Sequence, residues 1–95
     1  MPDKLSEQEL QSALDGLTNW THDSGRGAIK RQFTFKNFVE AFAFMTACAL
    51  EAEKMNHHPE WSNVYRTVDV VLTTHSADGL TQLDIDLAHK MEALA

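Results

Sequence analysis

The chain has few of the residues that stiffen a protein by covalent or conformational means. Its 95 residues include one cysteine, two prolines and four glycines. A single cysteine excludes an intrachain disulfide, and nothing else in the sequence indicates secretion. No apolar run approaches the roughly 20 residues that a membrane-spanning helix needs, and the N-terminal segment is charged. We therefore expect a soluble, cytoplasmic protein with no membrane partner.

Basic residues are also scarce. The chain has 8 Lys and Arg against 14 Asp and Glu, which gives a formal net charge of −6. Because nucleic acids and anionic lipid surfaces repel such a chain, we predict no nucleic-acid partner. A length of 95 residues provides one domain, residues 1–95, with one core. A core of that size is marginal alone, which favours oligomerisation.

Capping patterns predict a helix near each end of the chain. Ser6 with Glu9, and Thr81 with Asp84, have the spacing of a capping box, so helices are expected to begin after Ser6 and after Thr81. Gly16 can end the first helix. The last helix then has an apolar stripe made of Leu83, Leu87, Met91 and Leu94.

A third helix is predicted in the middle of the chain. Asn37 can cap it, and it is expected to end near Met55 or Asn56. Residues 38–50 are apolar on nearly every side of this helix, which indicates burial on more than one side. A chain of 95 residues can hardly enclose a helix in that way. A subunit interface on this helix is the simpler explanation.

Two segments are predicted to form β-hairpins. The first covers residues 20–35 with a turn at 23–27, and its second strand has an apolar face that Arg31 interrupts. The second covers residues 64–74 with a tight turn near 65–67, and its apolar face consists of Val64, Val68, Val70 and Leu72. The element order is therefore α-ββ-α-ββ-α. It indicates an α+β fold with a four-stranded antiparallel sheet and the helices packed on one face.

Three histidines are the candidates for chemistry. His57 and His58 stand beside Pro59 where the central helix ends, and His75 stands where a strand ends. Rigid scaffolds present functional side chains at such positions. Adjacent residues on a strand point to opposite faces, but the bend that Pro59 imposes lets both histidines share one site. Histidine suits proton transfer near neutral pH.

Other interpretations of these residues remain open. Loop histidines can occur by chance, and histidine also binds zinc, although no H-E-x-x-H motif and no second cysteine accompany these ones. Cys48 lies in the middle of an apolar helix and is better explained as a small core residue than as a nucleophile. Glu53 precedes His57 by four residues, so it can orient His57 and favour its charged form, or it can belong to a solvated helix end.

The histidine segments resemble the signatures of one enzyme family. Residues 51–61, Glu-Ala-Glu-Lys-Met-Asn-His-His-Pro-Glu-Trp, and the later Leu-Thr-Thr-His of residues 72–75 are similar to pterin-4a-carbinolamine dehydratases. Residues 63–65 and 79–81 extend the two matches, and the resemblance covers roughly residues 20–95. One departure is Asn56, where some relatives have Asp.

This resemblance implies an enzyme that dehydrates 4a-hydroxytetrahydrobiopterin to the quinonoid dihydropterin, which recycles the cofactor of aromatic amino acid hydroxylases. It implies no metal, no other cofactor, and a homodimer or homotetramer. His57 and His75 would be the acid/base pair and His58 would chiefly position the pterin. The implied pocket residues are His57, His58, Pro59, Thr74, His75, Ser76 and Ala77, with Glu53 and Trp61 as supporting residues.

Asp84 is expected first as a helix cap and second as a site residue, and His22 and His89 as surface residues. The alternative function is a non-enzymatic binding module on the same fold, used for assembly or transcriptional coactivation. Animal relatives of the resembled family also act as dimerisation cofactors of a hepatocyte transcription factor. A pure binding module has no need of all three histidines, so their presence favours the enzyme.

Overall fold

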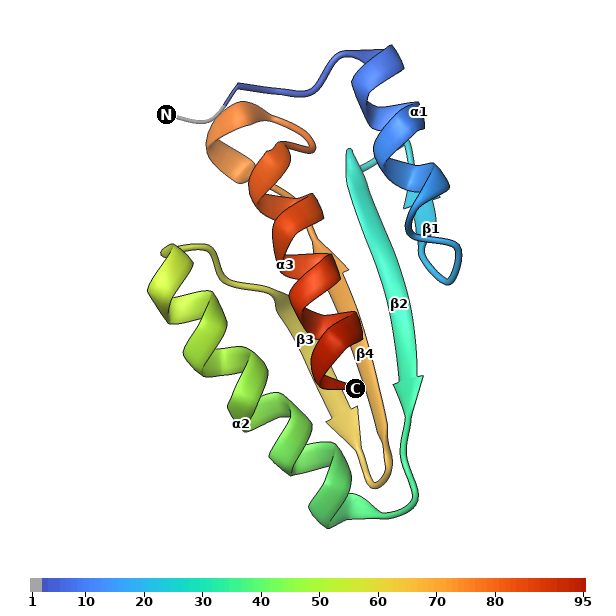
Figure 1. The fold of residues 1–95 in the computed structure, drawn as a ribbon, viewed down its shortest axis with the longest axis vertical. Helices are drawn as coiled ribbons and strands as arrows, with labels where there is room; N and C mark the ends of the chain where they lie inside the picture. The colour runs from blue at the N-terminus through green and yellow to red at the C-terminus, as the bar shows by residue number, and fades with distance from the viewer. Residues whose placement is uncertain (1–2) are drawn as a thin grey trace.

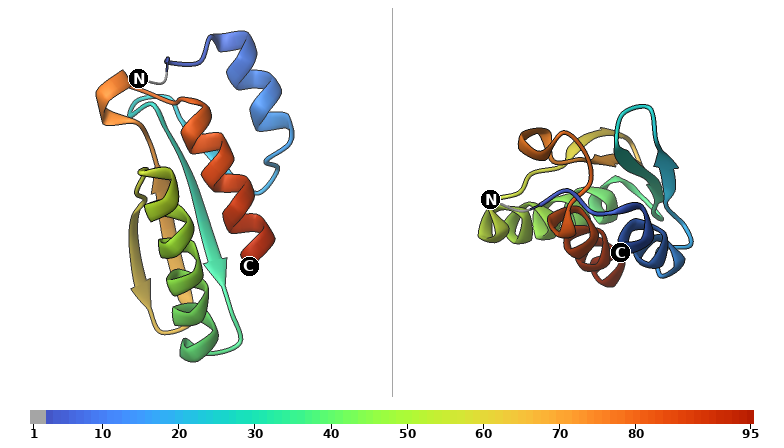
Figure 2. Two further views of the ribbon diagram at one scale, coloured as in Figure 1. Left: turned by 60° about the vertical axis from the view of Figure 1, so that its left-hand side comes forward. Right: turned by 90° about the horizontal axis from the view of Figure 1, so that it is seen from above.

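The computed structural model describes residues 3–95, which form three α-helices and one sheet. Strands β1 and β2 make the first hairpin, β3 and β4 make the second, and the sheet order is β1-β2-β4-β3 with all neighbours antiparallel. The helices cover one face of the sheet (Figures 1 and 2). The predicted α+β class and element order are confirmed. The elements are α1 (Glu7–Asp15), β1 (Thr21–Asp23), β2 (Ala28–Thr34), α2 (Phe38–Met55), β3 (Glu60–Val64), β4 (Thr67–Leu72), the 3-10 helix η1 (His75–Ala77) and α3 (Gln82–Leu94).

The predicted helix starts are all present. Ser6 accepts a hydrogen bond from the Glu9 backbone N–H, and the Glu9 side chain accepts one from the Ser6 backbone N–H. Thr81 and Asp84 form the second capping box, and the Asn37 side chain caps α2. Each cap satisfies N–H groups that have no partner within the helix, so short polar residues define where the helices begin.

The second hairpin begins earlier than predicted. Strand β3 starts at Glu60, directly after Pro59, and Val64 is 76% exposed, so its placement on the apolar face was wrong. Trp61 pairs with the buried Val70 and lies on the core side instead. The Asn63 amide donates to the backbone carbonyl of Tyr65 in the turn and to that of Thr67 at the start of β4, which fixes the register. The His-His-Pro segment is consequently held between the end of α2 and the start of β3.

The core lies between the sheet and the helices. Helix α3 buries Leu87 and Met91 as predicted, but Leu94 is exposed, and Ile85 and Ala88 complete the buried face. Cys48 is fully buried in this core, as expected for a small apolar residue. The largest fully buried apolar side chains are Phe33, Ile29, Leu72, Leu87, Met91, Val68 and Val70.

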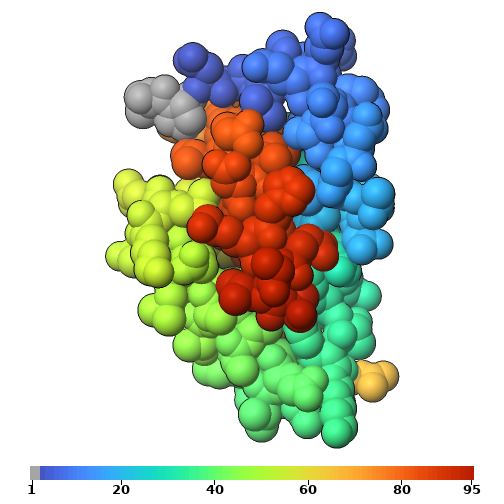
Figure 3. Space-filling model, in the orientation of Figure 1, coloured from blue at the N-terminus to red at the C-terminus, as the bar shows by residue number. Residues whose placement is uncertain are grey.

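Helix α2 buries only one of its faces against the chain. Ala41, Phe44, Cys48 and Ala52 are buried. On the remaining surface Val39 is 73% exposed, Phe42 55% and Leu50 63%. Figure 3 shows α2 at the surface, uncovered by the rest of the protein. Among residues 3–95, no helix is both long and apolar enough to cross a membrane.

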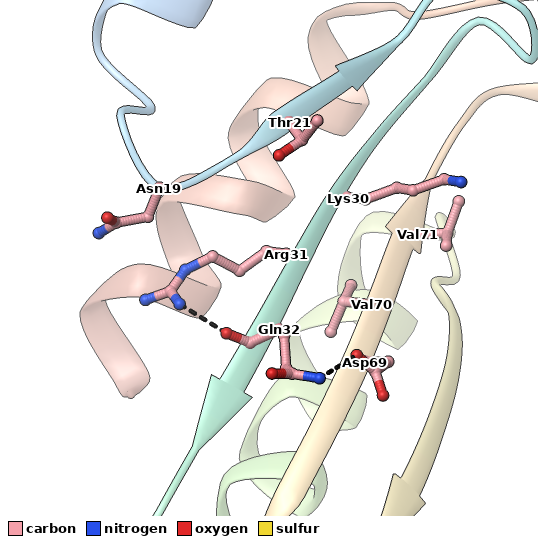
Figure 4. A pocket seen from close by; sticks show the side chains of 8 residues that line it. All are labelled: Asn19, Thr21, Lys30, Arg31, Gln32, Asp69, Val70 and Val71. Atoms are coloured by element: carbon pink, nitrogen blue, oxygen red, sulfur yellow. Dashed lines mark hydrogen bonds between the residues drawn. The ribbon is translucent and has the colours of Figure 1, made fainter.

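The open face of the sheet carries a shallow hollow of about 340 Å³ (Figure 4). Four of its polar side chains, those of Lys30, Arg31, Gln32 and Asp69, are paired with one another or with the body of the protein. Gln32 donates to Asp69 across β2 and β4 at 3.0 Å, and Lys30 forms an ion pair with Asp23 at 2.9 Å. The hollow is lined by Asn19, Thr21, Lys30, Arg31, Gln32, Asp69, Val70 and Val71, so it does not include the three histidines.

Arg31 interrupts the apolar face of β2 because it anchors the last helix. Its Nε donates to Glu92 Oε1 on α3 at 2.7 Å, and its guanidinium lies 4.1 Å from the centre of the Phe33 ring. Trp20 Nε1 donates to the same Glu92 oxygen at 2.9 Å. One carboxylate thus joins the start of the first hairpin, the middle of the sheet and the end of α3.

This tether predicts an acid-sensitive contribution to stability. The hydrogen bond from Arg31 holds the pKa of Glu92 below its usual range. The ionised Glu92 therefore stabilises the folded state fully at any pH above the pKa that this residue has in the unfolded chain. That stabilisation is lost as the pH falls through the lower pKa that Glu92 has in the folded protein. We expect Glu92→Gln to lower the free energy of unfolding by about 1–3 kcal/mol at pH 7. The difference from wild type should shrink below about pH 4.

Urea denaturation of both proteins at pH 7 and at acidic pH measures this effect. Glu7→Gln, which removes an exposed carboxylate from α1, is the control and should change stability by less than about 0.5 kcal/mol. Equal stability of Glu92→Gln and wild type at pH 7 would contradict the assignment.

Candidate active site

The three candidate histidines lie where several elements end. Asn56 closes α2 in the left-handed conformation, with φ of 52°, and this turns the chain so that His57 points inward and is buried. His58 and Pro59 follow before β3 starts, and both His58 and His75 are exposed. His75 is the first residue of η1, three residues beyond the end of β4. The short segment 57–60 contacts the start of α3 through His57 and contacts η1 through Glu60, so it links the histidines into one region.

His57 is paired with a buried carboxylate. Its Nε2 lies 2.6 Å from Oδ1 of Asp84, which is completely buried at the start of α3. The other Asp84 oxygen, Oδ2, accepts from the Thr74 hydroxyl at 2.7 Å and from the Thr81 backbone N–H at 3.0 Å. Because its other neighbours donate to Asp84, we assign its carboxylate as the acceptor and His57 as the donor through Nε2–H.

The hydrogens of this network can be counted. The Thr74 hydroxyl gives its only proton to Asp84, so at the 2.9 Å contact with Thr81 it must be the acceptor. The Thr81 hydroxyl gives its proton to Thr74 and accepts from the Leu83 backbone N–H. Throughout residues 3–95, no buried side-chain nitrogen or oxygen lacks a hydrogen-bond partner. The network is therefore complete, which fixes the ring of His57.

The expected pairing of Glu53 with His57 was wrong. Glu53 Oε1 lies 2.8 Å from Nε2 of His58, and both side chains are exposed. The left-handed turn at Asn56 explains the exchange, because it carries His57 into the protein and leaves His58 beside the end of the helix. Glu53 therefore orients the outer histidine of the pair, and Asp84 orients the inner one.

His75 has its own carboxylate partner on the other side of the region. Its Nε2 lies 3.0 Å from Oε2 of Glu60, and Arg26 from the turn between β1 and β2 donates to both oxygens of Glu60. The Arg26 hydrogen bonds hold the pKa of Glu60 below its usual range. Each of the three histidines is thus in contact with a different acidic residue.

The remaining predicted site residues occupy varied positions. Thr74 belongs to the Asp84 network, and Pro59 and Ala77 are half-buried. Ser76 is exposed on η1 beside His75. Trp61 packs against the hydrophobic core from β3. His22 and His89 are exposed, as predicted for surface residues.

Two rival chemistries can be compared with the geometry. Burial raises the pKa of the Cys48 thiol to about 12, with a further contribution from Glu51, so this cysteine is protonated and inert at neutral pH. Within the described part of the chain, no group of three or more His, Cys, Asp or Glu side chains is arranged to hold a metal ion. Independence from metal stays a prediction.

Sequence reasoning gave Asp84 only a secondary place in the site. The residue fits a capping box, and that pattern alone explains an acidic residue at this position. The missed signal is that its neighbours Leu80 and Ile85 are apolar, which indicates a buried helix start. A carboxylate at a buried helix start needs further partners, and the nearby histidines can provide one.

The buried network predicts a large cost for a small change at Asp84. In Asp84→Asn the new amide would place donor hydrogens against the donors of Thr81, Thr74 or His57. We expect a loss of about 2–4 kcal/mol in the free energy of unfolding. Urea denaturation measures it, with Asp86→Asn as the matched control on the exposed side of the same helix. The control should change stability by less than about 0.5 kcal/mol, and equal losses in both variants would contradict the network.

The chain matches one known family along nearly its whole length. Residues 3–94 match the model of the family described as Pterin 4 alpha carbinolamine dehydratase. A protein of Bradyrhizobium diazoefficiens is 57% identical, covering 100% of this chain and 95% of its own length. A protein of Burkholderia cenocepacia is 53% identical, covering 97% of this chain and 90% of its own length. Both are provisionally named pterin-4-alpha-carbinolamine dehydratases.

One solved structure agrees with this assignment, and a more distant one shares the fold. The crystal structure of a transcriptional coactivator/pterin dehydratase from Brucella melitensis has a TM-score of 0.94 at 53% identity, covering 98% of this chain and 99% of that one. A pterin dehydratase-like protein, described as a RuBisCO assembly factor in the alpha-carboxysome, shares the fold at 22% identity with a TM-score of 0.71, covering 81% of this chain and 89% of that one. The chain, with its three carboxylate-paired histidines, therefore belongs to the pterin-4-alpha-carbinolamine dehydratase family.

Proposed function

We propose that this protein dehydrates 4a-hydroxytetrahydrobiopterin to the quinonoid dihydropterin and water by histidine acid/base catalysis. In that role it recycles the cofactor of aromatic amino acid hydroxylases, and the pterin is its substrate. The observation that carries the proposal is the pairing of His57 with the buried Asp84 in a chain of this family. A histidine held by an ionised carboxylate is suited to accept and return a proton.

The reaction needs one proton acceptor and one proton donor. The N5–H bond of the carbinolamine breaks and its proton passes to a base. The bond between C4a and the hydroxyl oxygen breaks, and that oxygen takes a proton from an acid to leave as water. A C4a=N5 double bond remains, so atoms and charge balance without metal or redox chemistry. Two histidines of opposite protonation state supply both steps.

His57 and His75 are the proposed acid/base pair. In His57 the Nε2–H points to Asp84, which leaves Nδ1 free to exchange a proton with the substrate. Asp84 stabilises the imidazolium that forms when His57 gains a proton, as a buried carboxylate does for a catalytic histidine. His75 has the same arrangement with Glu60. His58, exposed and held by Glu53, chiefly positions the pterin.

A binding or assembly role on the same fold is the second candidate function. Its support comes from names alone, since the Brucella relative is called a coactivator as well as a dehydratase. Burying a carboxylate beside a histidine costs desolvation energy, and a module that only binds another protein can build the same helix start with uncharged residues. The buried pair of His57 and Asp84 therefore favours the enzyme.

The catalytic proposal predicts unequal effects of the histidine substitutions. A single acid/base residue typically contributes about 10²–10⁴-fold in rate. We expect His57→Ala and His75→Ala each to lower kcat, by less than that range if the uncatalysed dehydration is itself fast. Because the two act on one proton-transfer event, the double variant should be little worse than the poorer single variant. His58→Ala should raise KM more than it lowers kcat.

Steady-state decay of chemically generated 4a-hydroxytetrahydropterin, with and without protein, measures these effects. His22→Ala and His89→Ala are the controls and should retain wild-type rates, and a chelator should leave the wild-type rate unchanged. Circular dichroism checks that each variant is folded. Wild-type activity in folded His57→Ala and His75→Ala would refute the site, and zinc-dependent activity would refute the acid/base mechanism.

We also propose that the protein is a homodimer or homotetramer in which α2 forms an interface. The support is the exposed apolar surface of α2, which includes Val39, Phe42 and Leu50. Several exposed apolar side chains of this size on one helix are typical of a contact with another chain. A second copy of the chain offers the same apolar surface, so two helices can cover each other.

The structure predicts different outcomes for a charge at two positions on α2. Phe42→Glu places a charge on the exposed surface and should give a folded monomer of 10.7 kDa in light scattering. Met45 packs against the core, so Met45→Glu should unfold the protein instead. Gln11→Glu, on the exposed side of α1, should leave the wild-type oligomer intact. A wild-type mass of 10.7 kDa at micromolar concentration would refute the interface.

A further inference from the structure

The contact between Glu60 and His75 includes a second cation. Arg26 Nη1 donates to Glu60 Oε1 at 3.2 Å and Arg26 Nη2 donates to Oε2 at 3.1 Å. The same Oε2 lies 3.0 Å from Nε2 of His75. One carboxylate oxygen is therefore shared between a permanent positive charge and a ring that can gain or lose a proton.

We propose that Arg26 is a positioning residue for His75 that acts through Glu60. It holds the Glu60 carboxylate against the ring and limits how strongly that carboxylate draws a proton onto it. His75 is then oriented by a carboxylate whose charge Arg26 partly neutralises. The catalytic meaning of this arrangement rests on the proposed dehydratase function, whereas its electrostatic effect on His75 does not.

The fold places Arg26 beside the loop that carries His75. Gly27, the next residue, adopts φ of 62°, and a Cβ there would come within 3.0 Å of the Gly79 Cα. The Thr73 hydroxyl donates to the Gly27 carbonyl at 2.8 Å. Thr73 and Gly79 lie on either side of His75 in the chain, so the turn is anchored to both flanks of the histidine loop. Arg26 is thus held near Glu60 by the backbone.

Charge explains why a cation is useful at this position. A carboxylate alone beside an imidazole favours the imidazolium, which cannot accept another proton. Arg26 neutralises the carboxylate and repels a second positive charge. The pKa of Arg26 is raised, chiefly by its hydrogen bonds to Glu60, and the same bonds lower the pKa of Glu60. Both side chains are 44% exposed, so solvent and salt limit the size of the effect.

The charged groups around His75 come from three elements. Glu60 is the first residue of β3, and Arg26 belongs to the turn between β1 and β2. On the turn, Asp23 also faces Arg26, but it forms its own ion pair with Lys30 at 2.9 Å. Asp78, which follows η1, contacts His75 through a backbone hydrogen bond. The side-chain groups in the chain of contacts that reaches the His75 ring are therefore one carboxylate, Glu60, and one guanidinium, Arg26.

Nuclear magnetic resonance can follow the pH titration of the His75 ring in the full chain without any substrate. We expect Arg26→Gln to raise the pH midpoint of the His75 ring signals by about half a unit, because it removes a nearby positive charge. Glu60→Gln should lower that midpoint by a similar amount. Arg26→Lys keeps the charge but loses the bidentate contact with Glu60. Its His75 midpoint should therefore lie between those of wild type and Arg26→Gln.

Lys30→Gln is the matched control, because it removes a cation of similar exposure from the same hairpin without a bond to Glu60. It should leave the His75 midpoint unchanged. A midpoint in Arg26→Gln that equals or falls below the wild-type value would overturn the proposal, as would equal shifts in Arg26→Gln and Lys30→Gln. Arg26→Lys serves as the test variant if Arg26→Gln fails to fold.

Kinetics then separate this proposal from the proposed function. If the protein is a dehydratase, Arg26→Gln should move upward, by the same half unit or so, the limb of the kcat/KM profile against pH that His75 controls, with Lys30→Gln unchanged. If wild type has no dehydratase activity, the proposed function fails, and the resonance titration still decides whether Arg26 acts on His75.

Discussion

The buried carboxylate of Asp84 is the interaction on which the rest of the candidate site depends. It caps the first turn of α3 through the Thr81 backbone N–H, accepts the hydroxyl of Thr74 beyond β4, and holds the ring of His57 after α2. A carboxylate without water must have a donor at each oxygen, so these three partners cannot be moved independently. The requirement to satisfy one charge therefore sets where two helices and one strand meet.

The parts of the fold that local chemistry determines were predictable from the sequence. Ser6, Asn37 and Thr81 cap the helices at the predicted residues, because a cap needs only its own side chain and the next three residues. The start of β3 was harder to predict from the sequence. Apolar and polar residues alternate there over only a few positions, and the contribution of the Asn63 amide to the turn is visible only once both strands are paired.

The candidate site shows the same division between local and distant interactions. The three histidines could be selected from the sequence because they stand at element ends. Their partners could not, since His57 and Asp84 are 27 residues apart and the spacing rule for helices pointed to Glu53. The rule assumes that the helix continues to His57, but Asn56 ends it one residue earlier in a left-handed turn. A single backbone conformation thus decides which acidic residue each neighbouring histidine meets.

The three histidine–carboxylate pairs then differ in what surrounds them. The pair of His57 and Asp84 is buried, so its geometry is fixed and its attraction is little screened. The pairs of His58 and His75 are exposed, where water and salt weaken an ion pair and the side chains are free to move. In the proposed active site, the substrate would therefore meet one rigid histidine ring and two adjustable ones. Arg26 compensates for this exposure at His75, because a second anchor on Glu60 restores some of the order that burial gives to Asp84.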